Sequence, residues 1–393
     1  MRMMLLRNVM GGASTYHYHT DQTIRTLRET ARNKTPYSIR EPEKLKTFAN
    51  RLGIDISGSD AEIALNLCEF VEKDFNRPAY EPSRIVEILA PPERKKRWEE
   101  LGGIFPGGIY GGEMMLSTSS CLTNVDGYYV SLALKAMRLG IAMAYQSQIV
   151  NEYCQDVLFG IPRPPHTMRV DLGGVLDPEY VNVLPNGHEP FLGFAMVQLA
   201  RKPEWQEKAK AAGGAKGLRV IASIETGQEM IQRWEEDDVF YGFTGNWISQ
   251  EAVLASRCVD LFAADMNCSL PVAPLYAEKY NFKLMPVSDL VAFEGIEERL
   301  NYDPVEAEDQ AGKLLDMAVE NFKNRNSSGE AALNFPAGEA VVGFSTESIL
   351  DALGGTLDPL LDAIKSGAIK GVVGMVSCTT LRDYGQDVHS VAW

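Results

Sequence analysis

The sequence lacks long apolar runs, closely spaced cysteines and an excess of basic residues, and each absence excludes a class of protein. No run reaches the roughly 18 uncharged apolar residues that a membrane span needs, so no membrane span is expected. Lys and Arg total 38 against 53 Asp and Glu, which leaves a net charge of −15. This charge argues against nucleic-acid partners, because nucleic-acid binding rests on basic side chains that neutralise phosphates. Small molecules and other proteins are the expected partners.

The six cysteines are scattered and include no Cys-x-x-Cys pair, so no complete iron-sulfur site can be read from local spacing. Scattered thiols in a chain of 393 residues indicate a reducing cytoplasm. The opening apolar run is interrupted by Arg7 and no cleavage site follows, so we expect no signal peptide and a cytoplasmic location. Four cysteines lie in helical or strand-adjacent segments, where they are expected to pack as small apolar groups: Cys68, Cys121, Cys154 and Cys258.

The first part of the chain has helical periodicity. Apolar residues recur at helical spacing between residues 21 and 73 and again between 128 and 145, so residues 1–165 are predicted to form a mostly helical domain. The glycine-rich segment 107–112 is read as a turn, since no Lys-Ser/Thr follows as a phosphate-binding loop would require. The chain also contains several Gly-Gly doublets for which the sequence offers no reason.

Beyond the prolines at 162–165 the pattern changes to short apolar runs that alternate with amphipathic segments, as in βαβ units. The predicted fold class is therefore α/β, an N-terminal helical domain followed by Rossmann-like parallel-sheet domains. Residues 166–335 would form the first Rossmann-like domain, and residues 336–393 the truncated start of a second. The predicted strands are 181–184, 218–224, 240–243, 259–264, 284–287, 340–344 and 371–376.

Four residues with metal-binding side chains follow predicted strands. Parallel strands present their carboxyl ends at one edge of a sheet, where ligands bind. Imidazole, carboxylate and thiolate together suit iron or nickel with sulfide better than magnesium or calcium. Taken singly, each cysteine could be a buried apolar group and the other two could be loop hydrogen-bonders. The four candidate metal ligands are His188, Glu225, Cys268 and Cys378.

A series of motifs resembles the catalytic subunits of the anaerobic nickel-iron carbon monoxide dehydrogenases, in the superfamily shared with the hybrid-cluster proteins. The motifs occur in order at Asp156–Pro164, Gly187–Pro190, Thr226–Glu229, Asp265–Pro271 and Gly371–Val373, the last leading to Cys378. The resemblance implies a helical domain, two Rossmann-like domains, a homodimer and a nickel-iron-sulfur cluster held between domains. By resemblance, His188, Cys268 and Cys378 are cluster ligands, and the chain is expected to be most of the first two thirds of such a protein.

The chain departs from this family's pattern at three points. Glu225 stands where the family has a cysteine, and a hard oxygen ligand favours oxidised iron with bridging oxygen over nickel. The family's proton-carrying histidines match Tyr16, His19, Gln22 and Arg25, so His19 is the one predicted catalytic residue among them, with His17 nearby. The cysteines of the further 4Fe-4S clusters are expected outside the chain.

The resemblance implies an oxidoreductase that oxidises carbon monoxide with water to carbon dioxide and passes two electrons through iron-sulfur clusters to a redox partner such as ferredoxin. Because of Glu225, a hybrid-cluster-like enzyme that carries an iron-sulfur-oxygen cluster and reduces hydroxylamine or another small nitrogen or oxygen species is the alternative. A third possibility is a non-catalytic, redox-sensing remnant. The metal content of the protein would discriminate among the three.

Overall fold

The computed structural model describes residues 1–170, 172–325, 338–374 and 391. The chain divides into two compact units, Met1–Gly160 and Ile161–Trp393. In the described residues the first unit is helical and the second contains the β-sheets, which confirms the predicted fold class. The domain limits predicted from the sequence, 1–165, 166–335 and 336–393, stay predictions.

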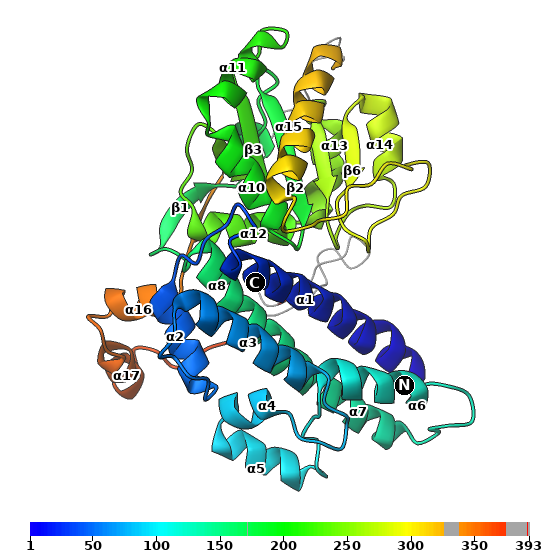
Figure 1. Ribbon diagram of the computed structural model, residues 1–393, viewed down its shortest axis with the longest axis vertical. Coiled ribbons are helices and arrows are strands. Elements are labelled where there is room, and N and C mark those ends of the chain that lie inside the picture. The colour runs from blue at the N-terminus through cyan, green and yellow to red at the C-terminus, as the bar shows by residue number, and fades with distance from the viewer. Residues whose placement is uncertain (171, 326–337, 375–390, 392–393) are drawn as a thin grey trace. The chain divides into compact units, whose positions relative to one another are not determined.

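The first unit is built on α1, which packs against α3 and α8 (Figure 1). Ile24 and Leu27 on α1 and Leu67 on α3 are fully buried, as their helical spacing predicted. No described helix in either unit combines the length and apolar character that crossing a bilayer would demand. The α-helices are α1 (Gly11–Ala31), α2 (Pro42–Arg51), α3 (Asp60–Phe75), α4 (Arg84–Leu89), α5 (Pro92–Glu100), α6 (Met115–Ser120), α7 (Tyr129–Ala142) and α8 (Val150–Phe159), and the π-helices are η1 (Met4–Met10), η2 (Ile109–Met114) and η3 (Met143–Ile149).

Two of the Gly-Gly doublets in the first unit have a packing reason. A Cβ atom on Gly108 would lie 2.5 Å from the carbonyl oxygen of Phe75, and one on Gly111 would lie 2.3 Å from that of Asn76. Only glycine allows backbones to approach this closely. The turn predicted at 107–112 is wrong from Ile109 onward, where η2 begins.

The second unit contains two sheets and the helices that follow their strands. Its strands are β1 (His166–Arg169), β2 (Val181–Gly187), β3 (Leu218–Ser223), β4 (Phe240–Phe243), β5 (Leu261–Ala264), β6 (Lys283–Pro286) and β7 (Glu339–Val342). Its helices are α9 (Leu172–Val175), α10 (Phe191–Ala200), α11 (Pro203–Ala211), α12 (Ile224–Arg233), the 3-10 helix η4 (Trp247–Ser249), α13 (Gln250–Ala255), α14 (Ala273–Tyr280), α15 (Ala307–Asn324), α16 (Thr346–Ala352) and α17 (Asp358–Lys365).

The larger sheet has five parallel strands in the order β4-β3-β2-β5-β6. The chain builds outward from β2 through β3 to β4, and then returns to the other side of β2 with β5 and β6. This is the strand order of a Rossmann-like sheet, and its switch point lies between β2 and β5. All five strands coincide with predicted apolar runs, since a strand buried on both faces is apolar throughout.

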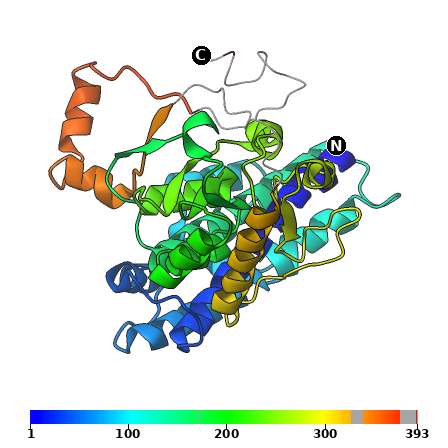
Figure 2. The ribbon, with the colours of Figure 1, turned by 90° about the horizontal axis from the view of Figure 1, so that it is seen from above.

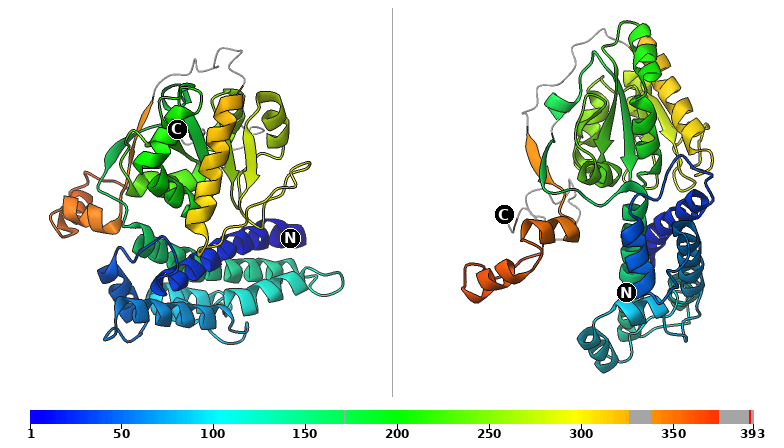
Figure 3. Two further views of the ribbon diagram at one scale, coloured as in Figure 1. Left: turned by 45° about the horizontal axis from the view of Figure 1, so that its top comes forward. Right: turned by 60° about the vertical axis from the view of Figure 1, so that its left-hand side comes forward.

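Helices cover both faces of this sheet (Figure 3). On one face, α10 and α15 lie side by side, and the buried residues of α15 include Leu314 and Leu315. On the other face, Leu184, Ile221 and Phe262 of the strands form a core with residues of α13 and α14. Residues 191–211 form two helices and not one, because Pro203 begins α11 as a separate element.

The second sheet pairs segments that are far apart in the sequence. β1 and β7 are antiparallel, with His166 opposite Val342. Short helices α16 and α17 follow β7 (Figure 2), and the apolar residues Leu360, Leu361 and Ile364 of α17 are exposed. No strand is present at 371–374, and the last two residues of the strand predicted there lie outside the described residues.

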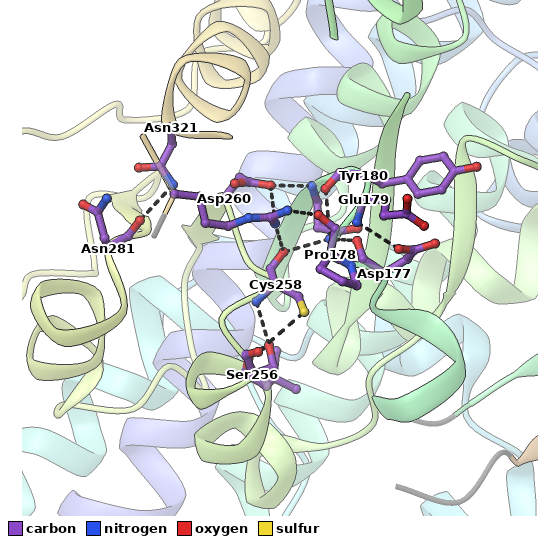
Figure 4. A network of polar contacts seen from close by, with 12 residues as sticks. Asp177, Pro178, Glu179, Tyr180, Ser256, Cys258, Asp260, Asn281 and Asn321 are labelled. Atoms are coloured by element: carbon purple, nitrogen blue, oxygen red, sulfur yellow. Dashed lines mark hydrogen bonds and ion pairs between the residues drawn. The ribbon is translucent and has the colours of Figure 1, made fainter. Parts of the chain in front are cut away.

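A buried polar network lies at the amino end of β5, around Asp260 (Figure 4). The backbone N–H of Asn182 donates to Oδ2 of Asp260 at 2.9 Å, and the guanidinium of Arg325 lies 3.1 Å from the same oxygen. The Asn182 and Arg325 side chains also donate to the carbonyl oxygen of Cys258. This network joins α15 to the start of the central strands.

Candidate metal centre

Three of the predicted metal ligands follow neighbouring strands of the parallel sheet. His188 directly follows β2, and Glu225 lies in the first turn of α12, which begins where β3 ends. Cys268 lies in the loop after β5. Because β3, β2 and β5 are adjacent and parallel, the three residues share the carboxyl edge of the sheet at its switch point.

His188 and Glu225 form a direct pair. Nε2 of His188 lies 2.7 Å from Oε2 of Glu225, with the imidazole largely buried and the carboxylate about half exposed. Burial alone would raise the pKa of Glu225, but the hydrogen bond and charge interaction with His188 outweigh it and lower that pKa. Nδ1 of His188 is buried and has no hydrogen-bond partner in the described part of the chain. The pair can therefore present an imidazole nitrogen and a carboxylate oxygen to one metal ion.

Asp265, the residue after β5, connects the segments that carry His188 and Glu225. Its Oδ1 accepts a hydrogen bond from the backbone N–H of His188, and its Oδ2 accepts one from the hydroxyl of Thr226 at 2.5 Å. Burial raises the pKa of Asp265 to about 7, although both hydrogen bonds act in the opposite direction. A Cβ atom at position 187 would lie 1.8 Å from Oδ1 of Asp265, so Gly187 makes this approach possible.

A second network holds the loop that carries Cys268. The fully buried amide of Asn186 accepts hydrogen bonds from Ser223 at 2.8 Å and from Gln250 at 2.9 Å. Gln250 also donates to the carbonyl oxygen of Cys268 at 2.5 Å and accepts from the N–H of Leu270 at 3.2 Å. The buried side-chain amides of Asn186 and Gln250 therefore connect the ends of β2 and β3 to the loop after β5.

The backbone is strained at two points of this edge. Ile224, which precedes Glu225, has φ of 56°, and Cys268 has φ of 54°. A β-branched residue rarely adopts positive φ, and such conformations cost on the order of 1–3 kcal/mol and cluster at functional sites. Beside Cys268 lies a cavity of about 380 Å³ that Ser269, Leu290 and Phe293 also line, so there is room next to the thiol for a group larger than one ion.

The donor set is incomplete within the described residues. Cys378, the fourth predicted ligand, lies outside them, and in the parts of the chain that the structure describes no three His, Cys, Asp or Glu side chains are grouped closely enough to hold a metal ion. His188, Glu225 and Cys268 therefore fit a metal cluster in the chemistry of their donors and in their common edge. They do not form a closed site by themselves.

His19, the predicted catalytic residue, lies on α1 in the first unit. Its side chain is buried, and its Nε2 lies 3.0 Å from Nε2 of Gln155 on α8. His17, two residues earlier, is in ring contact with Phe75, and burial lowers its pKa to about 4, so it is neutral at pH 7. Each of the two histidines thus sits in a different environment on the same helix.

Sequence reasoning missed the residues that support the candidate ligands. Asp265, Thr226, Asn186 and Gln250 are all buried and contact the segments that carry His188, Glu225 or Cys268. The available signal was position, because Asn186 and Asp265 stand at the carboxyl ends of adjacent predicted strands. A buried aspartate or asparagine there must find partners across the switch point.

The strand order and the donors at its switch point define a Rossmann-like α/β protein with a metal-competent edge. The chain belongs to the Prismane/CO dehydrogenase family, whose model matches residues 1–392. It is 98% identical over 392 residues to carbon monoxide dehydrogenase 2 of Methanosarcina mazei, and 90% identical over 392 residues to carbon monoxide dehydrogenase 2 of Methanosarcina acetivorans. These findings confirm the family resemblance drawn from the motifs.

A solved structure agrees with these relatives. The nickel-free carbon monoxide dehydrogenase from Thermococcus sp. AM4 superposes with a TM-score of 0.89 at 32% identity, over 96% of this chain and 58% of that one. The two Methanosarcina alignments cover 100% of this chain and 61% of each relative, so the chain spans about three fifths of their length. Nothing in these comparisons favours the hydroxylamine alternative.

Proposed function

We propose that this chain is the part of a carbon monoxide dehydrogenase that carries the first ligands of its active-site cluster. The protein would convert carbon monoxide and water to carbon dioxide, two protons and two electrons. The observation that carries the proposal is the placement of His188, Glu225 and Cys268 after three adjacent parallel strands, at the switch point of the sheet. Family membership and the names of the relatives support it.

His188, Glu225 and Cys268 would hold the cluster together with Cys378. An iron-sulfur cluster with nickel supplies, when bound, the Lewis acid and the electron acceptor that this oxidation requires. In the pair as described, Nε2 of His188 and Oε2 of Glu225 share one proton, and both atoms would be available to hold the group once that proton is lost. The buried Nδ1 of His188 can then carry the imidazole proton.

The chain's own part in catalysis is to orient the donors and to move protons. We assign proton transfer to His19, because an imidazole can accept a proton at one nitrogen and release it from the other. Its Nε2 faces the amide of Gln155, which fixes the orientation of the ring. Burial lowers the pKa of His17 to about 4, so His17 is a poor proton acceptor at pH 7 and the proposal does not use it in this role.

The remaining features of the proposal concern the complete protein. They are a homodimer, further 4Fe-4S clusters, a ferredoxin-like electron acceptor and a reducing cytoplasm. The thiols of Cys68, Cys121, Cys154 and Cys258 are free, which supports a reducing environment.

The test is metal analysis and carbon monoxide oxidation by the full-length protein, purified without oxygen. We expect iron and sulfide in the parent, and loss of metal in His188→Ala and Cys268→Ala. Cys258→Ala is the matched control, since Cys258 is a buried cysteine at the opposite end of the same sheet. Iron content equal to that of the parent in both ligand variants would refute the proposed site.

A further inference from the structure

Asp265 contacts both segments that carry the His188–Glu225 pair. It accepts hydrogen bonds from the backbone N–H groups of His188 and Glu189 in the loop after β2, and from the hydroxyl of Thr226 in α12. Thr226 is fully buried and adjacent to Glu225, so its bond fixes the first turn of α12. One carboxylate directly after β5 therefore joins the ends of β2 and β3, which lie on the same side of β5 in the sheet.

The backbone on both sides of the contact fixes Asp265 against the loop after β2. Position 187 has φ of 139° and no side chain, which lets the loop run against the Asp265 carboxylate. The backbone N–H of Asp265 donates to the carbonyl of Asn186 at 2.8 Å, which fixes the aspartate from its other end. Each of these bonds is costly to lose, because a buried polar group left without its partner is destabilising.

We infer that Asp265 is a positioning residue that holds His188 and Glu225 at the separation at which both can bind the same metal ion. The inference rests on the proposed function for the identity of the site. Asp265 acts through the two ligands and contacts neither ligand's donor atom. Loss of its carboxylate would leave the sheet intact and let the loop and the first turn of α12 move independently.

The experiment compares Asp265→Asn with the parent in the full-length protein. An amide keeps the size of the carboxylate but cannot accept at both atoms. We expect Asp265→Asn to retain iron when freshly prepared, to show an altered electron paramagnetic resonance spectrum, and to release iron to a chelator at least tenfold faster. Thr226→Val should change the spectrum in the same direction, and Thr226→Ser, which keeps the hydroxyl, should restore it.

Asp260→Asn is the matched control. Asp260 is an equally buried aspartate at the other end of β5, where it pairs with Arg325. It should lower the unfolding temperature without changing the spectrum or the rate of iron release. The inference is wrong if Asp265→Asn matches the parent in both readouts, or if Asp260→Asn changes them as much.

The outcomes separate this inference from the proposed activity. If the parent holds iron but does not oxidise carbon monoxide, the activity fails, and Asp265 is judged by spectrum and iron release alone. If the parent holds no iron, crystal structures of the parent and Asp265→Asn decide. The inference requires His188 and Glu225 to be in hydrogen-bond contact in the parent and apart in the variant, and an unchanged pair in the variant overturns it.

Discussion

Gly187 and Asp265 lie so close that a Cβ atom on residue 187 would sit 1.8 Å from Oδ1 of the aspartate. We therefore predict that Gly187→Ala displaces Asp265 and the loop that carries His188. The positive φ at this position adds about 1–3 kcal/mol of strain for alanine. The free energy of unfolding and the iron content of the full-length protein should both fall.

Gly140→Ala is the control for this change. Gly140 lies in α7 and has open space where a Cβ atom would go. Alanine is the better helix former, so the variant should be at least as stable as the parent. Equal iron content in Gly187→Ala and Gly140→Ala would contradict the prediction.

Replacing Glu225 by cysteine tests what the carboxylate contributes. Because oxygen donors prefer harder iron, Glu225→Cys should shift the site toward sulfide and nickel and raise carbon monoxide oxidation. The measurements are metal analysis and paired assays of parent and variant. If the parent already oxidises carbon monoxide rapidly with stoichiometric nickel, the carboxylate does not have this role.

The buried ion pair of Glu113 and Arg138 gives a prediction for the first unit. Glu113 is fully buried, accepts from Arg138 at 2.6 Å and also accepts from the N–H of Gly107 at 2.8 Å. Glu113→Ala leaves this N–H without its partner and removes the carboxylate from a guanidinium that, in the described residues, then bonds only to the carbonyl of Ala79, which should cost about 3–5 kcal/mol. Chemical denaturation measures this loss. The exposed pair Glu69–Lys73 on α3 is the control, and Glu69→Ala should change stability little.

Asp260 should make stability depend on pH. Burial raises its pKa to about 7, despite the opposing charge of Arg325. The folded state therefore binds a proton more tightly than the unfolded chain, and this contribution to stability, complete below roughly pH 4, is lost as the pH rises through 7. Asp260→Asn removes it, so the stability of the parent relative to the variant should fall by at most about 1.4 kcal/mol per pH unit in this window. A difference that is constant between pH 4 and 7 would contradict the assignment.

The sequence predicted the parallel sheet well because its strands are buried on both faces and read as continuous apolar runs. It did not predict β1 or its pairing with β7, since a four-residue strand has too few residues to show periodicity and its partner lies far along the chain. Strand-end placement brought His188, Glu225 and Cys268 to one edge. The contact between His188 and Glu225, and the role of Asp265, depend on register and on the point where α12 begins, which composition and spacing do not determine.

The exposed apolar side chains of α17 affect how strongly isolated molecules of residues 1–393 associate with one another. Leu360, Leu361 and Ile364 offer a patch that would favour self-association, while the net charge of −15 makes separate molecules repel one another. In dilute buffer the repulsion acts over tens of ångströms, whereas at about 1 M salt it is screened within roughly 3 Å. Light scattering should therefore rise with salt concentration, in contrast to a protein held together by exposed ion pairs.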